Sequence, residues 1–65
     1  MRFHIQNMAC RGCARGVTTA VQSVDPEAGI EIDLSTRFID LQSAKPGTAF
    51  ITALETAGFT AVPAA

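Results

Sequence analysis

Hydrophobic and polar residues alternate at the start of the chain, in RFHIQNM (residues 2–8). Phe3 and Ile5 are apolar, and polar residues, His4 among them, lie between and around them. Alternation of this kind is typical of a strand with one buried face. We therefore expect a first strand here, with His4 as a solvated residue on its open face.

The spacing of apolar residues changes to a helical one from Cys13 onward. The residues that follow Cys13 form a single apolar stripe: Val17, Ala20, Val21 and Val24. Asp25-Pro26 ends this helix, because a residue before proline avoids the helical conformation. Gly16 lies inside the helix and costs up to about 1 kcal/mol relative to alanine.

Residues 29–42 alternate again and predict two strands joined by a short turn at Ser35-Thr36. The apolar positions of this hairpin share one face: Ile30, Ile32, Leu34, Ile39 and Leu41. Phe38 points to the opposite, wetter face. The acidic residues there are read as solvated: Glu31, Asp33 and Asp40.

A second helix follows the loop SAKPGT, opened by Pro46 or Thr48. Its apolar stripe is expected to contain Phe50, Ile51, Leu54 and Ala57. Gly58 is placed to end the helix. FTAVP then predicts a short last strand, in which Pro63 suits a sheet edge.

The predicted order is βαββαβ in one domain, residues 1–65. Two helices with one apolar stripe each can cover one face of a four-stranded antiparallel sheet. The fold class is therefore α+β, with the ferredoxin-like arrangement.

Composition and charge exclude several classes of protein. The formal net charge of −1 argues against nucleic acid, which requires a basic surface. No apolar run approaches the ~20 residues of a membrane span, and the N-terminus does not resemble a signal peptide. We expect a cytoplasmic protein with reduced thiols and no membrane insertion.

The chain has two cysteines, Cys10 and Cys13, in the loop before the first helix. A helix N-terminus favours thiolate over thiol, and Arg11 and Arg15 add positive charge nearby. Thiolates are ligands for soft metals and also redox nucleophiles. Easy ionisation of the two thiols is therefore expected for a metal site and for a redox pair alike.

The number of ligands narrows the choice of metal. Structural zinc takes four ligands, and beyond Cys10 and Cys13 the chain offers one histidine, His4, four residues before the loop. Two thiolates suffice for Cu(I). An exposed pair of this kind is open to a third thiolate from a partner, which is the chemistry of metal transfer. The sequence contains no recognisable carboxylate pair, Ser-His-Asp set or phosphate loop, so no feature in it points to an enzyme.

The motif Met8-Ala9-Cys10-Arg11-Gly12-Cys13, with the helical stripe after it, IEIDL and ALETAGF, resembles the heavy-metal-associated domain family. That family contains bacterial copper chaperones and the N-terminal modules of copper-transporting P-type ATPases. The resemblance covers essentially the whole chain.

The resemblance implies that Cys10 and Cys13 bind one Cu(I), with Ag(I) as a surrogate. Met8 would pack beneath the loop without binding metal, and Arg11, Gly12 and Phe59 would support or shield the site. The implied partner is the metal-binding domain of a copper-transporting P-type ATPase. Arg11 and Arg15 are either solvated charges or a docking site for an acidic patch on that partner.

Alternatives stay open at this point. Zn(II), Cd(II) and Hg(II) are other candidate cargoes, although Ala9 beside the first cysteine supplies no oxygen ligand. A Cys-x-x-Cys thiol oxidoreductase is a further one. Phe59 is compatible both with a free chaperone, which we favour, and with a module excised from a transporter. A metal-bridged homodimer is a further expectation. Asn7 departs from the glycine common before the methionine, and we expect it to leave the site untouched.

Overall fold

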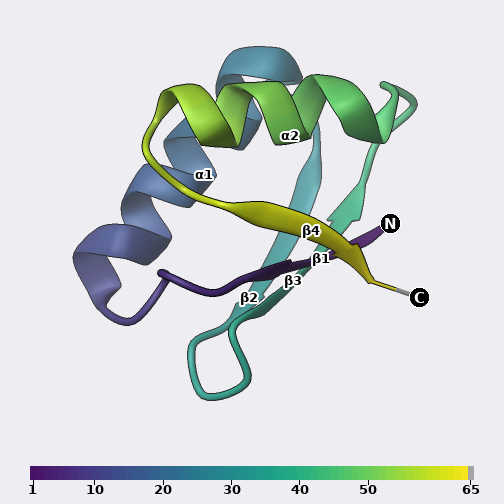
Figure 1. Ribbon diagram of the computed structural model, residues 1–65. Helices are drawn as coiled ribbons and strands as arrows, with labels where there is room; N and C mark the ends of the chain where they lie inside the picture. The colour runs from purple at the N-terminus through teal and green to yellow at the C-terminus, as the bar shows by residue number, and fades with distance from the viewer. Residues whose placement is uncertain (65) are drawn as a thin grey trace.

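The computed structural model of the protein describes residues 1–64 and has the predicted order βαββαβ (Figure 1). The elements are β1 (Arg2–Ile5), α1 (Arg11–Val24), β2 (Gly29–Asp33), β3 (Phe38–Gln42), α2 (Gly47–Thr56) and β4 (Ala61–Ala64). The strands pair in the order β2-β3-β1-β4, and each pairing is antiparallel. Both helices lie on one face of the sheet, so the ferredoxin-like fold is confirmed.

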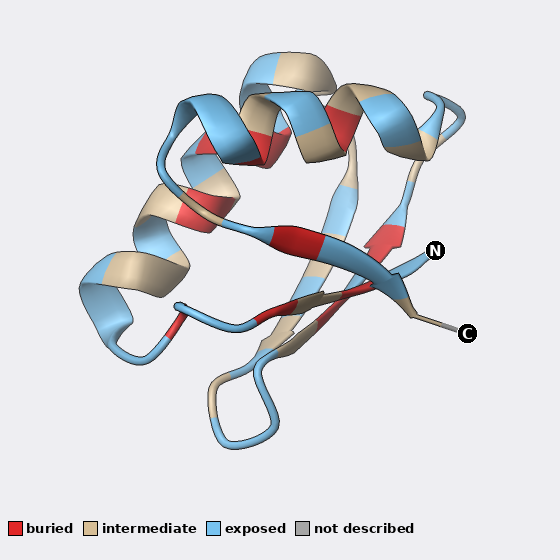
Figure 2. Cartoon of the chain, viewed as in Figure 1, coloured by how far each residue is buried: buried red, intermediate tan, exposed pale blue. Residues whose placement is uncertain are grey.

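The hydrophobic core lies between the sheet and the two helices (Figure 2). In β1, Phe3 and Ile5 are buried, as the alternation predicted, and in β3 the same holds for Ile39 and Leu41. The buried core consists of Phe3, Ile5, Met8, Val17, Ala20, Val21, Ile39, Leu41, Phe50, Leu54 and Ala61. Within the described chain, no helix is both long and apolar enough to cross a membrane.

Helix α1 ends where Asp25-Pro26 predicted. Asp25 is the C-terminal cap residue, and its backbone N–H still donates to the Val21 carbonyl. Its carboxylate accepts hydrogen bonds from the Ser43 hydroxyl and the Glu27 N–H. The Ser43 bond fastens the end of α1 to the loop that follows β3, and the Glu27 bond closes the turn directly after the helix.

Helix α2 begins at Gly47, after Pro46, and buries Phe50 and Leu54. The inclusion of Ala57 in its apolar stripe was wrong, because the helix ends at Thr56 and Ala57 is exposed. Gly58 then takes a φ of +93°, a conformation that side-chain-bearing residues rarely adopt. The predicted glycine stop is therefore confirmed.

The face of the sheet away from the helices carries Phe38, as predicted. The His4 ring lies edge-on to Phe38 at 4.9 Å, and the Arg2 guanidinium lies 4.4 Å from the Phe38 ring centre. Arg2 also forms an ion pair with Asp40 at 3.6 Å. Pro63 lies in β4 at the edge of the sheet, where a missing N–H is tolerated.

Candidate metal site

Cys10 and Cys13 are positioned by the first turn of α1. Cys10 has extended backbone angles and is the N-cap residue, and its Sγ accepts a hydrogen bond from the Cys13 N–H at 3.3 Å. The Cys10 carbonyl accepts the first helical bond, from the Ala14 N–H. Cys13 therefore lies inside the helix, and the loop predicted to hold both cysteines ends at Cys10.

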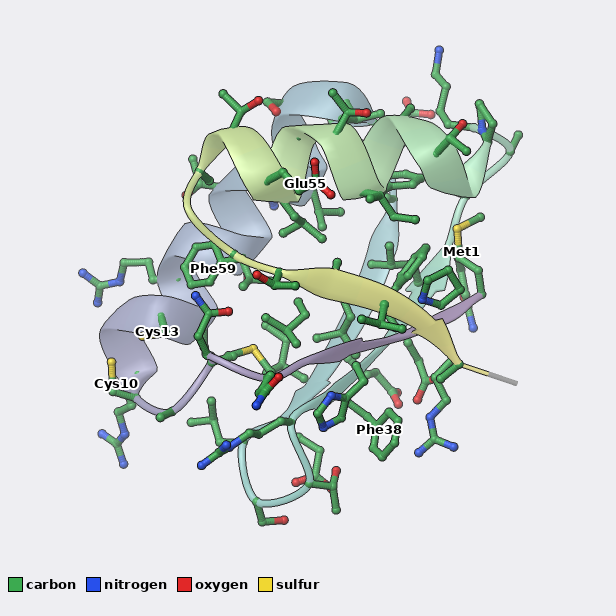
Figure 3. All side chains as sticks on the ribbon, viewed as in Figure 1. Met1, Cys10, Cys13, Phe38, Glu55 and Phe59 are labelled. Carbon is green, nitrogen blue, oxygen red and sulfur yellow. The ribbon has the colours of Figure 1, made fainter. Side chains whose placement is uncertain are left out.

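The two sulfur atoms lie 2.9 Å apart and share a hydrogen bond. This separation is far longer than a disulfide bond, and both thiols are free. Cys10 is exposed and Cys13 is half-buried, at one tip of the molecule (Figure 3). The pair thus presents two sulfurs to the same region of solvent.

The pKa of the Cys13 thiol lies below its ordinary value. The largest cause is the hydrogen bond with Cys10, followed by bonds from backbone groups of the helix start, beginning at Ala9. The charges of Arg11 and Arg15 are not among the causes. The expected ease of thiolate formation therefore holds for Cys13, but through hydrogen bonds rather than arginine charge.

Met8, two residues before Cys10, is fully buried. Its backbone N–H donates to the Ile5 carbonyl at 3.1 Å, which folds the chain back at the end of β1. Met8 therefore belongs to the core, as expected. Gly12, between the cysteines, has space around it, since an added Cβ would contact only the Cys10 Sγ, at 3.8 Å.

Phe59 lies against the same helix, one turn beyond Cys13. A Cβ added at Gly16 would lie 3.1 Å from two carbons of the Phe59 ring, so the ring would have to shift by a few tenths of an ångström to accept it. The Phe59 N–H donates to the Leu54 carbonyl at 2.8 Å. In the sequence, Gly16 was visible only as a cost to the helix, and its contact with Phe59 was not predicted.

Asn7 connects the cysteine loop to the segment that carries Phe59. Its Nδ2 donates to the Gly58 carbonyl at 2.8 Å, and its Oδ1 accepts from the Thr60 N–H at 3.1 Å. Neither bond reaches a cysteine, so the prediction that Asn7 leaves the site untouched stays a prediction, but the link from Asn7 to segment 58–60 was not foreseen. An amide side chain directly before the Met-x-Cys-x-x-Cys motif was the available signal.

Arg37 also supports the cysteine loop, which the sequence did not predict. It ends the hairpin turn with a φ of +63°, and its guanidinium donates to the Gln6 carbonyl at 3.0 Å. The Ile5 N–H in turn donates to the Arg37 carbonyl at 2.8 Å. The base of the cysteine loop is thereby attached to the β2–β3 turn.

No third donor joins the sulfur pair within residues 1–64, where no group of three His, Cys, Asp or Glu side chains could hold a metal ion. His4 lies on the open face of the sheet, against Phe38. Two thiols with one open side are a donor set for a soft ion of low coordination number.

Comparison with known proteins gives matches among solved structures. No protein-family model and no curated protein sequence matches the chain. The copper chaperone Atx1 from Synechocystis PCC6803, in a trimeric form, is 31% identical with a TM-score of 0.92, over 95% of this chain and 98% of that one.

Two further solved structures of metal-binding proteins also match nearly the whole chain. A gold binding protein is 34% identical with a TM-score of 0.90, over 94% of each chain. The solution structure of a cyanobacterial copper metallochaperone, ScAtx1, is 31% identical with a TM-score of 0.78, over 95% of this chain and 97% of that one. With this fold, this identity and this coverage, the chain belongs to the heavy-metal-associated domain family, with copper chaperone-like proteins as its relatives.

Proposed function

We propose that the protein is a copper chaperone that carries one Cu(I) between the thiolates of Cys10 and Cys13. The observation that supports this most directly is the sulfur pair itself, with two free thiols 2.9 Å apart at an exposed helix N-terminus. The copper chaperones among the relatives support the choice of cargo.

The donor set fits Cu(I) better than a hard or four-coordinate ion. Soft thiolates select Cu(I), whereas a closed zinc site takes four ligands. With metal–sulfur bonds of about 2.3 Å, as for zinc, sulfurs 2.9 Å apart would subtend an angle well below tetrahedral. The pair must therefore spread on binding, and an outward turn of the exposed Cys10 side chain would give up the hydrogen bond that its Sγ accepts from the Cys13 N–H.

The exposed side of the pair also suits transfer by ligand exchange. A partner thiolate forms a bond to Cu(I), one cysteine–copper bond breaks, and the released thiolate takes a proton from water. No electron is transferred and no substrate molecule is converted, so in this proposal the protein acts as a carrier and not as an enzyme. In this proposal the partner is the metal-binding domain of a copper-transporting P-type ATPase, met in the cytoplasm by a free chaperone.

Docking would use the surface beside the cysteines. Arg11 and Arg15 are exposed there. A largely apolar groove of about 510 Å³ runs between α1 and α2, with Gly12, Arg15 and Ala53 among its lining residues. An acidic surface on the partner complements these arginines. A metal-bridged homodimer uses the same exposed sulfurs, and one Atx1 relative is described as side-to-side.

A second candidate cargo is another soft ion. The gold binding protein is 34% identical to this chain, and Ag(I) and Hg(II) share the preference for two thiolates. Zn(II) and Cd(II) are weaker candidates, because Ala9 beside Cys10 offers no oxygen ligand. A thiol oxidoreductase remains the alternative if no metal binds.

Native mass spectrometry of the reduced protein under nitrogen tests the proposal. The protein is offered Cu(I) and Zn(II) in equal amounts, each with a competing chelator. We expect one Cu(I) per chain with loss of two protons, and loss of tight binding in Cys10→Ser and Cys13→Ser. His4→Ala is the matched control and should bind as the wild type does. Retained zinc, or tight Cu(I) binding by either serine variant, contradicts the two-thiolate site.

A further inference from the structure

The Asn7 side chain is attached to the chain on both sides of Phe59. Its Nδ2 donates to the carbonyl of Gly58 and its Oδ1 accepts from the N–H of Thr60, at 2.8 and 3.1 Å. The partners lie 51 and 53 residues away along the sequence. One carboxamide therefore fixes the segment 58–60 against the loop that leads to the cysteines.

The Phe59 ring carries this attachment to helix α1. The ring packs on Gly16, three residues after Cys13 and thus on the neighbouring part of the same helix face. Cys13 and Phe59 are both partly buried against the core. In Figure 3 the Phe59 ring lies beside the helical turn that carries Cys13, whereas Cys10 lies farther out.

We propose that Asn7 is a positioning residue that holds the Phe59 ring against Gly16, on the face of α1 that also carries Cys13, and so slows the access of outside ligands to the Cys13 sulfur. Met8, the next residue, is buried and anchors the loop, so Asn7 is a fixed point from which segment 58–60 is held. Any consequence for metal retention rests on the proposed function. The protection of Cys13 is a property of the metal-free protein.

Alkylation of the reduced, metal-free protein by iodoacetamide tests this inference. The rate at Cys13 is measured relative to Cys10 in the same molecule by peptide mass spectrometry. Asn7→Ala removes two hydrogen bonds, and we expect the Cys13 rate to rise about tenfold. Ser43→Ala is the matched control, because it removes another long-range side-chain bond, to Asp25, far from the cysteines. It should leave the ratio unchanged.

A double-mutant cycle separates positioning from general loosening of the fold. If Asn7 acts through Phe59, Asn7→Ala has no further effect in a Phe59→Ala background. Asn7→Gln keeps the carboxamide but displaces it by one methylene, and should give a Cys13 rate between those of the wild type and Asn7→Ala. If the alanine variant does not fold, the test is whether the Cys13 rate of Asn7→Gln exceeds that of the wild type. An unchanged Cys13 rate in Asn7→Ala, additive effects in the cycle, or an equal rise in Ser43→Ala overturns the inference.

The transfer of bound Cu(I) to an excess of bathocuproine disulfonate gives the second readout. We expect Asn7→Ala to release Cu(I) faster than the wild type does. The ratio of the two release rates should be about the same as the ratio of their Cys13 alkylation rates. Failure of the wild type to bind Cu(I) would refute the proposed function and leave the alkylation result intact. Bound Cu(I) with release rates equal in wild type and Asn7→Ala would refute the role of Asn7 alone.

Discussion

The ring of Phe59 lies so close to Gly16 that any side chain at residue 16 would meet it. An added Cβ would come within 3.1 Å of the ring carbons Cε2 and Cζ, closer than ordinary van der Waals contact. Contact between α1 and the segment after α2 thus depends on the absence of one methyl group. Gly16 lies three residues after Cys13 on the same helix, so the packing of Phe59 bears on the part of α1 that carries Cys13.

Gly16→Ala should destabilise the protein by about 1–3 kcal/mol through overpacking, partly offset by the better helix propensity of alanine. Chemical denaturation measures the change. Gly12→Ala is the matched control in the same helix, since its Cβ would contact only the Cys10 Sγ at 3.8 Å. We expect it to be neutral or stabilising by up to about 1 kcal/mol. Equal effects of the two variants would contradict the packing explanation.

Gly58→Ala should lower the free energy of unfolding by about 1 kcal/mol or more, because φ is +93° there. Nothing lies within 4 Å of an added Cβ, so the cost comes from the backbone and not from a clash. Gly58→Asn should cost less than Gly58→Ala, since asparagine tolerates left-handed angles better. A larger loss for the asparagine variant would contradict the backbone explanation. Thermal unfolding ranks the two.

Cys10→Ala should raise the pKa of Cys13 toward its ordinary value, because the hydrogen bond with Cys10 is the largest cause of the lowering. The pH profile of Cys13 alkylation, followed by mass spectrometry, should shift to higher pH in this variant. Arg11→Gln is the control and should leave the midpoint in place. A shift in Arg11→Gln as large as that in Cys10→Ala would restore the arginine explanation.

Acid should lower the free energy of unfolding of the protein, in part through protonation of Asp25. The Ser43 hydroxyl, then the Glu27 N–H, holds the pKa of Asp25 below its ordinary value. The unfolded chain therefore binds the proton more tightly than the folded one, so this stabilisation is complete above about pH 4 and disappears as the pH falls through the folded pKa.

The measurement is Tm against pH for the wild type and Ser43→Ala. We expect the gap between the two proteins to be wider at pH 6 than at pH 2. A gap of the same size across this range would show that the hydroxyl does not act through the carboxylate. Asp33, whose pKa is lowered chiefly by the Ser35 hydroxyl, adds to the acid sensitivity of both proteins equally.

The sequence predicted the element order because apolar spacing is a local property. The period of two in β1 and β3, and of about 3.6 in α1, follow from which side chains must leave water together. Pro26 and Gly58 act on the backbone of their own neighbourhood, so the ends of both helices were also predictable. Ala57 was assigned to the wrong face, because the end of α2 at Thr56 turns the chain away one residue earlier than the stripe suggested.

The sequence by itself determined that the sulfurs of Cys10 and Cys13 lie together, since the two residues are three positions apart and share one helix start. Only the tertiary structure decided what surrounds them. Asn7 bonds to residues more than 50 positions away, Arg37 reaches Gln6 across the sheet, and Phe59 packs on Gly16. Such contacts depend on how strands and helices are arranged in space. Neither composition nor periodicity encodes which residues distant in sequence come together in the fold.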